Sequence, residues 1–293
     1  MADLASSTHP VFQPGRVAVI TGAASGIGLS TAEFCAAQGM HLCLADNNAD
    51  GLESARARLA AENAAAGRQG RVMAVATDVS QRPAVQHLKD EAYAAYGAVH
   101  FLMNNAGREG AGQIFGDPAV WDSILGVNLM GVIHGTQAFA PAMIAQGGPA
   151  AIVNTGSKQG ITCPPGNTAY NVSKAGVKVL TEGLAHELRN TPGCAVTAHL
   201  LVPGFTFTGL TRAHTETKPA GAWEPWQVTD FMVRCMEAGD FYIICPDNDV
   251  SRDLDNARML WAALDIVENR PPLSRWHPDH AEAFRTFLAE RGL

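Results

Sequence analysis

Short apolar runs alternate with longer segments of helical composition through the first 200 residues. Seven runs have the length and apolar character of strands: RVAVI (16–20), HLCLA (41–45), RVMAVA (71–76), VHFLM (99–103), AAIVN (150–154), AVTAHLL (195–201) and FYIIC (241–245). The first six are nearly continuous in apolar character, as expected for strands buried on both faces. Segments rich in Ala, Leu and Glu lie between them, at 49–66, 82–96, 118–146 and 168–190. The repetition predicts a doubly wound α/β fold, a seven-stranded, mainly parallel sheet with helices on both faces.

No low-complexity linker or internal repeat divides the chain, so we expect one domain over residues 15–293. The N-terminal MADLASSTHPVFQPG has neither the basic start nor the apolar core of a signal peptide, and we expect residues 1–14 to form a short mobile tail. The segment 205–235 is rich in Thr, Pro and aromatic residues without a clear period. It is interpreted as a long excursion with one or two short helices. A helical C-terminal extension follows over about 250–293.

The amino-acid composition limits the kinds of binding partner that the chain can have. The 293 residues are 47% hydrophobic and 17% charged, which suits a globular chain with a sizeable core. The formal net charge is −7 and no dense Lys/Arg run occurs, which argues against nucleic acid or an anionic membrane as a partner. No apolar run approaches the roughly 20 residues that a membrane-spanning helix needs.

The cysteines and histidines do not predict a metal site. Six cysteines are widely scattered and form no CxxC pair: Cys35, Cys43, Cys163, Cys194, Cys235 and Cys245. Reduced thiols in a cytoplasmic protein are the simplest interpretation. The run HPDH (277–280) superficially suggests a metal site, but no Cys or further carboxylate–His set is nearby. A helix start after Pro278 accounts for it better, and we predict no metal.

A glycine-rich turn separates the first predicted strand from a helix, in RVAVITGAASGIGLSTAEF. Gly22, Gly26 and Gly28 have the spacing G-x-x-x-G-x-G. The first suits a tight turn, and the other two let the backbone approach a pyrophosphate and the helix pack on the strand. The helix N-terminus adds unpaired N–H groups and a partial positive charge. Its place between a strand and a helix predicts that this turn is a dinucleotide site, whereas a glycine triplet alone is common in loops.

Asp46 ends the second predicted strand, in HLCLADNN. A carboxylate at this place accepts hydrogen bonds from both hydroxyls of an adenosine ribose and repels a 2′-phosphate. Ser25, Asn47 and Asn48 bring no compensating positive charge. The sequence therefore favours NAD over NADP, and a plain turn residue is the alternative role for Asp46.

Seven motifs, in order, resemble those of the short-chain dehydrogenase/reductase family over about residues 14–210. They are TGAASGIG (21–28), DVS (78–80), NNAG (104–107), VNLMGV (127–132), Ser157, Tyr170-x-x-x-Lys174 and PGFTFT (203–208). The resemblance implies a single-domain Rossmann-like fold, NAD as the cofactor and a catalytic set of Asn128, Ser157, Tyr170 and Lys174. With Asp46 included, the expected cofactor-binding residues are Gly22, Ser25, Gly26, Ile27, Gly28, Asp46, Asp78, Val79, Asn105, Ala106, Gly107, Tyr170, Lys174, Pro203, Gly204, Thr206 and Thr208.

The spacing of Tyr170 and Lys174 carries the chemistry. An i, i+4 pair lies on one face of a helix, so the lysine stands close to the tyrosine. Its positive charge, with that of an oxidised nicotinamide, stabilises the phenolate and lowers the tyrosine pKa from about 10. In the family's scheme Tyr170 is the base that takes the alcohol proton, and Ser157 binds the substrate oxygen. Lys174 also binds the nicotinamide ribose, and Asn128 holds a water that relays the proton.

Each catalytic residue has a plainer alternative. A Tyr-x-x-x-Lys pair is often a packing aromatic beside a solvated amine, a lone Ser after a strand is often a cap, and Asn128 can satisfy a kinked helix. Their joint occurrence at these spacings favours an enzyme that interconverts a secondary alcohol and a ketone with NAD. An NAD-binding redox sensor without turnover is the alternative function. Such sensors commonly lose a catalytic group, and this chain retains all four.

Two features depart from the family's pattern. Thr155-Gly156 and Lys158 flank Ser157, and a helical tail replaces a Gly-rich final strand. This tail resembles that of bacterial dehydrogenases that oxidise benzylic alcohols of lignin-derived aryl ethers. It also differs from the segment that builds one tetramer interface. We therefore expect a homodimer through the helices near 118–146 and 168–190, with a homotetramer as the alternative.

The family builds its substrate lid where this chain has the 205–235 excursion. Aromatic residues there can wall an apolar pocket, and we predict that Phe205, Phe207, Trp223 and Trp226 contact the substrate. A bulky, aromatic secondary alcohol or ketone is the expected substrate. The alternative is that these side chains form a small core under a long loop.

Overall fold

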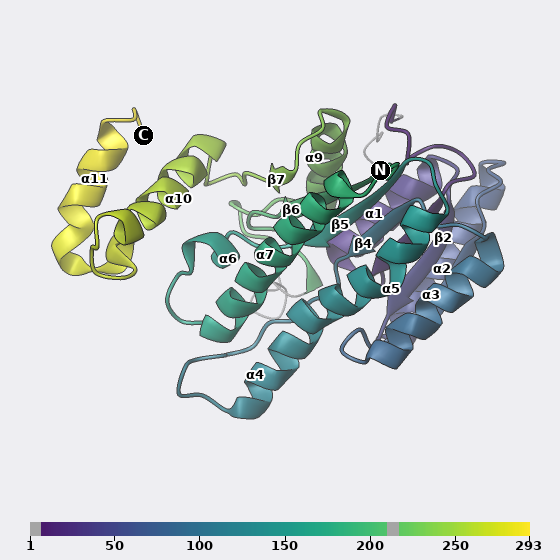
Figure 1. Ribbon diagram of the computed structural model, residues 1–293, viewed down its shortest axis with the longest axis horizontal. Coiled ribbons are helices and arrows are strands. Elements are labelled where there is room, and N and C mark those ends of the chain that lie inside the picture. Colours follow the sequence, from purple (N-terminus) through teal and green to yellow (C-terminus); the bar gives the residue numbers. More distant parts are fainter. Residues whose placement is uncertain (1–6, 210–216) are drawn as a thin grey trace.

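The computed structural model describes residues 7–209 and 217–293. Seven strands form one sheet in the order β3-β2-β1-β4-β5-β6-β7, and all six pairings between neighbours are parallel (Figure 1). The strands are β1 (Val17–Thr21), β2 (His41–Asp46), β3 (Val72–Ala76), β4 (Phe101–Asn104), β5 (Ala150–Thr155), β6 (Val196–Val202) and β7 (Tyr242–Ile244). The predicted doubly wound sheet is confirmed, and each of its strands lies within about two residues of the predicted run.

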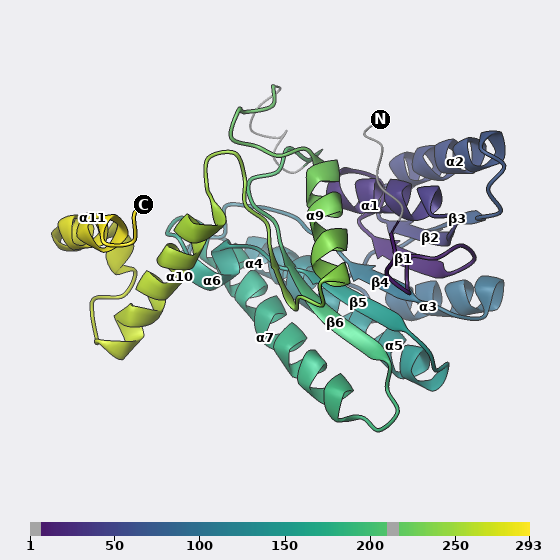
Figure 2. The same cartoon turned by 90° about the horizontal axis from the view of Figure 1, so that it is seen from above.

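Helices cover both faces of this sheet, as Figure 2 shows. One layer is α1 (Gly26–Ala37), α2 (Ala49–Ala65) and α9 (Pro225–Glu237); the other is α3 (Arg82–Tyr96), α4 (Pro118–Leu125), α5 (Gly131–Ala145) and α7 (Thr168–Asn190). Each layer has its own apolar core: Phe34, Leu52 and Met232 lie in the first, and Leu88 and Phe139 in the second. Burial on both faces explains why the strand sequences are continuously apolar.

The order of the strands reverses at the boundary between β1 and β4. From β1 the chain builds outward through β2 and β3, and it then returns to place β4 on the other side of β1. In open parallel sheets a crevice forms at such a reversal, outside the carboxyl ends of the strands. The glycine turn after β1 and the NNAG turn after β4 both lie at this point.

The N-terminal segment packs more closely than expected. We expected residues 1–14 to form a mobile tail, but Val11 and Phe12 are each only 1% exposed. Phe12 makes edge-on contacts with Phe34 of α1 and Phe101 of β4, with ring centroids 5.2 and 5.0 Å apart. The core of the first layer therefore includes this segment from Val11 onward. The first six residues of the expected tail lie outside the described part of the chain.

The chain ends in a helical extension that projects from the body of the domain (Figures 1 and 2). It comprises α10 (Arg252–Val267), two short 3₁₀ turns and α11 (Ala281–Ala289). Trp261 of α10 packs against Phe284 and Phe287 of α11, and its ring nitrogen donates to Ser274 Oγ at 2.8 Å. The guanidinium of Arg270 lies 4.0 Å from the centre of the Trp261 ring. The extension thus has a small core of its own.

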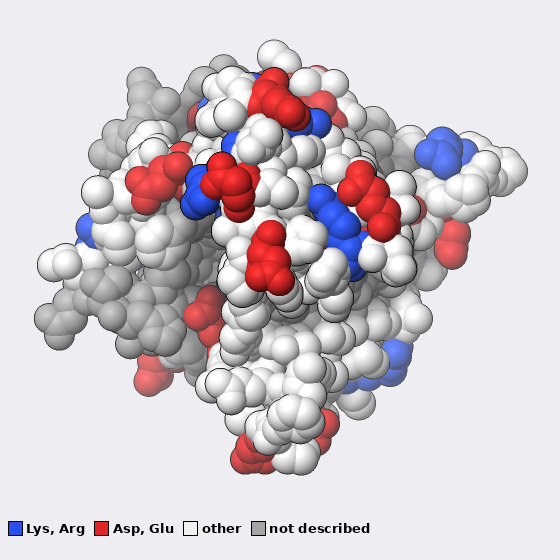
Figure 3. All heavy atoms as spheres, turned by 90° about the vertical axis from the view of Figure 1, so that its left-hand side faces the viewer, with Lys and Arg blue, Asp and Glu red and all other residues white. Residues whose placement is uncertain are grey.

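Four further observations concern the surface, a membrane span, a metal site and the cysteines. The side of the molecule that the extension forms carries acidic and basic side chains close together (Figure 3). Within residues 7–209 and 217–293, no helix is both long and apolar enough to cross a bilayer. The same described residues contain no cluster of three or more His, Cys, Asp or Glu side chains arranged to hold a metal. All six cysteines are free thiols.

The buried position of Phe12 generates a stability prediction. Phe12→Ala should lower the free energy of unfolding by about 3–5 kcal/mol, because it removes a fully buried ring and leaves a cavity. Denaturant unfolding followed by circular dichroism measures the change. Phe115→Ala is the matched control, since Phe115 is 101% exposed and should change the free energy by no more than about 0.5 kcal/mol. Equal, small effects of the two substitutions would show that residues 7–14 contribute nothing to the core.

Candidate active site

A cleft of about 470 Å³ runs along the carboxyl ends of the strands. Most of the predicted cofactor and catalytic residues line it, namely Gly22, Ser25, Gly26, Ile27, Asp46, Asn105, Gly107, Ser157, Tyr170, Lys174, Pro203, Gly204, Thr206 and Thr208. They follow β1, β2, β4, β5 and β6, or begin α1 and α7. The parallel sheet therefore brings together side chains that the sequence keeps up to about 180 residues apart.

The glycine turn has the backbone geometry that a pyrophosphate site requires. Gly22 and Gly26 have φ angles of +69° and +57°, in the left-handed region that favours glycine. A Cβ on Gly28 would lie 2.2 Å from the carbonyl oxygen of Gly22, so only glycine fits under the turn. The N-terminus of α1 opens into the cleft at Gly26. These features fit the phosphates of a dinucleotide.

Asp46 lies at the other end of this half of the cleft. Its Oδ2 accepts from the backbone N–H of Ala24 at 3.0 Å, and its Oδ1 accepts from the N–H of Asn48 at 2.9 Å. The carboxylate thus ties the end of β2 to the glycine turn while it faces the cleft. The local role and the expected ribose-binding role are compatible, because a carboxylate has about four acceptor positions.

The NNAG turn fastens β4 to its neighbours. The hydroxyl of Thr21, at the end of β1, accepts from the backbone N–H groups of Asn105 and Ala106 at 2.9 and 3.1 Å. Below the turn, Asn104 Nδ2 donates to Asn154 Oδ1 at 2.8 Å, inside the buried sheet. This bonding holds β1, β4 and β5 together where the cleft is deepest.

Four of the expected cofactor residues lie beside the cleft rather than on its lining. Gly28 and Ala106 sit behind the glycine and NNAG turns, where each is in close contact with Gly22. Asp78 Oδ1 accepts from the N–H and hydroxyl of Ser80, at 3.0 and 2.7 Å. The carbonyl oxygen of Val79 accepts from the ring of His134 at 3.0 Å. Their part in cofactor binding stays a prediction.

Ser157, Tyr170 and Lys174 meet on one wall of the cleft. Ser157 follows β5, while Tyr170 and Lys174 lie one turn apart in α7. Lys174 is 4% exposed, its Nζ donates to the carbonyl oxygen of Thr155 at 2.8 Å, and it stands 5.8 Å from the centre of the Tyr170 ring. The Ser157 side chain lies near enough to the Tyr170 hydroxyl to lower the pKa of that tyrosine. The predicted three-residue constellation is present.

Burial dominates the proton affinities of this group. It raises the pKa of Tyr170 to about 12, while the hydrogen bond from Ser157 lowers this pKa and the negative charge of Glu109 raises it. Burial also lowers the pKa of Lys174 to about 8. The expected lowering of the Tyr170 pKa depends on Lys174 together with an oxidised nicotinamide, and it stays a prediction. Among the chain's own groups, burial has the larger effect, because moving the phenolate out of water costs free energy.

Asn128 lies in a single π-helical turn, Gly126–Met130, that joins α4 to α5. Such turns often mark functional sites. Its side chain is fully buried: Oδ1 accepts from the N–H of Arg108 at 2.8 Å, and Nδ2 donates to the carbonyl of Arg108 at 2.9 Å. Asn128 therefore fixes the loop that forms the rim of the cleft beside Gly107. The relayed water assigned to it by the resemblance stays a prediction.

Of the four expected substrate residues, Phe205, Phe207 and Trp223 lie together through backbone hydrogen bonds, but only Phe205 lines the cleft. Phe205 lines the cleft and is 42% exposed. Phe207 is buried and pairs through its backbone with Trp223 at 2.8 Å, and Trp223 packs against Phe231 and the core of the first helix layer. Trp226 is exposed at the start of α9. Of the expected lid over 205–235, residues 210–216 lie outside the described part of the chain.

Seven residues that sequence reasoning did not select also line the cleft: Arg108, Glu109, Thr155, Gly156, Lys158, Gln159 and Gly209. Each lies within two residues of one of the recognised motifs. That adjacency was the available signal, but no residue type or spacing among them distinguished wall residues from ordinary loop residues.

Comparison with known proteins agrees with this geometry. Residues 16–219 match the family model described as short chain dehydrogenase. The chain is 36% identical over 198 residues to a 3-oxoacyl-[acyl-carrier-protein] reductase of Thermotoga maritima, covering 67% of this chain and 76% of that protein. It is 33% identical over 201 residues to an oxidoreductase of Staphylococcus aureus, covering 68% of this chain and 81% of the other.

A solved structure matches over nearly its full length. A short chain dehydrogenase/reductase from Burkholderia phymatum, in complex with NAD, is similar with a TM-score of 0.78 and 37% identity, over 90% of this chain and 98% of that one. The parallel sheet, the glycine turn and the serine–tyrosine–lysine wall are thus found in a chain whose sequence matches the family model over most of its length, and the protein belongs to the short chain dehydrogenase family of oxidoreductases.

Proposed function

We propose that this protein interconverts a secondary alcohol and a ketone with NAD as the cofactor. One observation carries the proposal: Ser157, Tyr170 and Lys174 line the same cleft as the glycine turn and Asp46. The proton-transfer groups and the dinucleotide site therefore share one solvent-accessible space. The similar chain from Burkholderia phymatum was solved in complex with NAD, which supports the same choice here.

Different residues of the cleft would bind different parts of the cofactor. The α1 N-terminus and the N–H groups of the glycine turn would hold the pyrophosphate, Asp46 would hold the adenosine ribose, and Lys174 would hold the ribose next to the nicotinamide. When bound, the oxidised nicotinamide supplies hydride acceptance and a positive charge near the phenol. The uncharged surroundings of Asp46, with Ser25 and Asn48 beside it, favour NAD over NADP.

The chain's own residues would carry out the proton transfer. Tyr170 Oη takes the hydroxyl proton of the alcohol in the oxidation direction and returns it in reduction. The Ser157 hydroxyl, on the same wall as Tyr170, orients the substrate oxygen and stabilises its changing charge. Lys174 stands beside them with an ammonium that Thr155 holds in place. With a pKa of about 12, Tyr170 is protonated at neutral pH and is therefore ready to donate a proton in ketone reduction. The positive charge of a bound oxidised nicotinamide would favour the phenolate, which is the base that alcohol oxidation needs.

The substrate half of the cleft lies between Ser157 and Phe205. Phe205 presents an exposed ring there, which supports a bulky, aromatic secondary alcohol or ketone. Glu109 and Gln159 also line the cleft and would receive polar substituents of that substrate. Phe207 and Trp223 pack into the core behind Phe205. We therefore propose Phe205 as the aromatic residue that contacts the substrate.

We further propose a cytoplasmic homodimer. Met130, Val172 and Val179 are 37%, 44% and 66% exposed on the helices near 118–146 and 168–190, and large apolar side chains on one face are typical of an interface. Six free thiols agree with a reducing compartment. The expected oligomer is checked by light scattering.

The function is tested by cofactor reduction with a panel of aryl and aliphatic secondary alcohols. Wild-type protein should reduce NAD with an aryl alcohol, and Tyr170→Phe should lower kcat/KM by about 10²–10⁴-fold, because general acid–base catalysis is lost. Tyr242→Phe is the matched control, since Tyr242 is exposed and bonds Glu182 at the surface. Full activity of Tyr170→Phe would contradict the mechanism. NAD binding without turnover of any alcohol would favour the redox-sensor alternative.

Asp46→Asn tests the cofactor preference. The amide keeps a hydrogen-bonding oxygen but removes the charge that repels a 2′-phosphate. Two like charges about 4 Å apart repel by roughly 4 kcal/mol at an effective dielectric of about 20. We therefore expect the ratio of kcat/KM for NADP to that for NAD to rise by about 10- to 100-fold after screening. An unchanged ratio would show that Asp46 serves only as a turn residue.

Glu109→Gln tests the electrostatics of Tyr170. The negative charge of Glu109 raises the pKa of this tyrosine, so its removal should lower that pKa. Alcohol oxidation requires the phenolate, and kcat should therefore reach half its maximum at a lower pH in the variant. A pH profile of kcat measures the shift, with the exposed, remote Glu290→Gln as the control. A pH profile identical to that of the wild type would show that Glu109 does not influence the acid–base step.

A further inference from the structure

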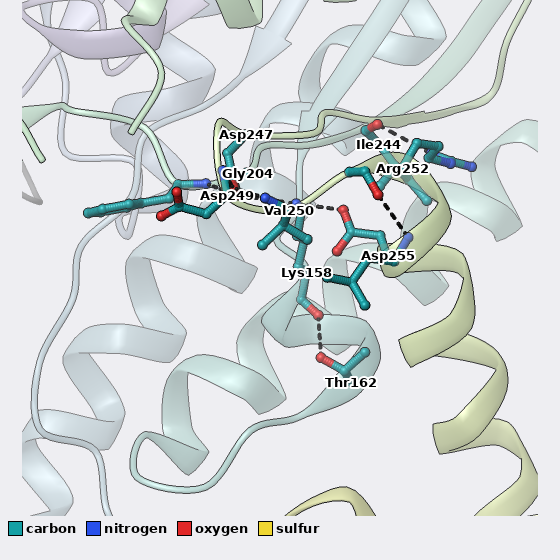
Figure 4. A network of polar contacts seen from close by, with 12 residues as sticks. Lys158, Thr162, Gly204, Ile244, Asp247, Asp249, Val250, Arg252 and Asp255 are labelled. Atoms are coloured by element: carbon teal, nitrogen blue, oxygen red, sulfur yellow. Dashed lines mark hydrogen bonds and ion pairs between the residues drawn. The ribbon is translucent and has the colours of Figure 1, made fainter. Parts of the chain in front are cut away.

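A buried ion cluster links the catalytic wall to the C-terminal extension. Lys158 directly follows Ser157, and its Nζ lies 2.6 Å from Asp255 Oδ2 and 3.4 Å from Asp247 Oδ2 (Figure 4). Both aspartate side chains are 6% exposed, and that of Lys158 is 21% exposed. Asp255 belongs to α10, and Asp247 lies in the loop after β7. We call Lys158, Asp247 and Asp255 the ion triad.

On one side, the ion triad is continuous with the backbone that carries Ser157. Ser157 Oγ accepts from the N–H of Gln159 at 3.2 Å, and the carbonyl oxygen of Lys158 accepts from the N–H groups of Ile161 and Thr162 at 3.0 Å each. These bonds form the short helix α6 (Gln159–Thr162). A Cβ on Gly160 of this helix would lie 2.4 Å from the backbone of Lys174. A displacement of Lys158 therefore moves Ser157 relative to the tyrosine and lysine of α7.

On the other side, the ion triad holds the wall that faces Ser157. Asp247 Oδ2 accepts from the N–H of Phe205 at 3.0 Å, and its Oδ1 accepts from the N–H of Val250 at 2.8 Å. A Cβ on Gly204 would lie 2.7 Å from the carbonyl of Pro246, so these two loops are in direct contact. The position of the Phe205 backbone is thus set by the same carboxylate that binds Lys158.

Charge balance makes the three positions depend on one another. Two carboxylates this close and this buried repel unless a cation lies between them, and a buried pair becomes costly when one member is removed. Arg258 and Arg275 are the other charged groups that face Asp255, beside Lys158 in a small cavity of about 50 Å³. They lie on the extension side, so Lys158 is the cation that crosses from the extension to the catalytic loop.

We propose that the ion triad is a positioning device that fixes the distance between Ser157 and Phe205 across the substrate half of the cleft, and that α10 takes part in substrate positioning through Asp255. The proposal rests on the proposed function in so far as its kinetic test needs an alcohol that the enzyme oxidises. It makes Lys158 a positioning residue, which acts through Ser157 and Phe205 on the orientation of the substrate.

The kinetic test compares Lys158→Met and Asp255→Asn with wild type, using the best alcohol of the panel. We expect each variant to lower kcat/KM for the alcohol by about 10- to 100-fold, because misplacement of reacting groups by about 1 Å has effects of this size. KM for NAD should change less than kcat/KM for the alcohol, since the ion triad is bonded to one expected cofactor-binding loop, residues 203–208, and not to the glycine turn or Asp46. Asp265→Asn is the matched control: Asp265 binds Ser274 and Arg270 inside the extension and does not touch the catalytic loop.

A second measurement does not depend on turnover. Hydrogen–deuterium exchange of the peptide 157–163 reports the α6 amides, and that of 203–207 reports the Phe205 amide. Both should exchange at least tenfold faster in Lys158→Met and in Asp255→Asn, and at the wild-type rate in Asp265→Asn. Asp255→Asn keeps the shape of the side chain, so it remains informative if Lys158→Met does not fold.

The outcomes separate the two proposals. If no alcohol is oxidised by the wild type, the proposed function fails while the exchange result still decides the role of the ion triad. If Lys158→Met alters the kinetics and Asp255→Asn does not, Lys158 acts directly on the substrate and the proposal is overturned. It is also overturned if both variants lose thermal stability but keep wild-type kinetics and wild-type exchange in these two peptides.

Discussion

The hydroxyl of Thr21 accepts two backbone N–H groups from the turn after β4, and the cleft depends on this junction. It lies where the strand order reverses, the one place in the sheet where helices on adjacent strands leave in opposite directions. Together with the pairing of β1 and β4, it fixes the glycine turn beside the NNAG turn. Backbone N–H groups, a carboxylate and the serine–tyrosine–lysine wall therefore open into the same space.

The cleft contains buried ionisable groups, whose charged forms are unfavourable there. Lys174 is almost fully buried. Burial lowers the pKa of Lys174 and raises that of Tyr170, so it favours the uncharged form of both side chains. The Ser157 side chain lowers the pKa of Tyr170 but does not offset its burial. A cation near the phenol would lower this pKa further, which is the direction that the proposed alcohol oxidation requires.

The C-terminal extension shares in this arrangement although it projects from the domain. Trp261 of α10 packs against Phe284 and Phe287 in a core of the extension's own. Asp255 of the same helix forms an ion pair with Lys158, the residue after Ser157. An ion pair in a nearly buried setting has strict geometric demands. It is therefore suited to fixing a position, even where it adds little net stability.

The sequence by itself determined the α/β fold, the dinucleotide turn and the Ser157–Tyr170–Lys174 constellation. Each of these is encoded locally, through apolar runs of strand length, glycines at fixed spacing, or two residues one helical turn apart. Only the tertiary structure decided that Phe12 is a core residue, that Phe207 and Trp223 face inward, and that Lys158 meets Asp247 and Asp255. These outcomes depend on contacts between segments that lie 16 to 97 residues apart in the sequence. An aromatic or charged residue has the same local pattern whether it ends in the core, in the cleft or at the surface.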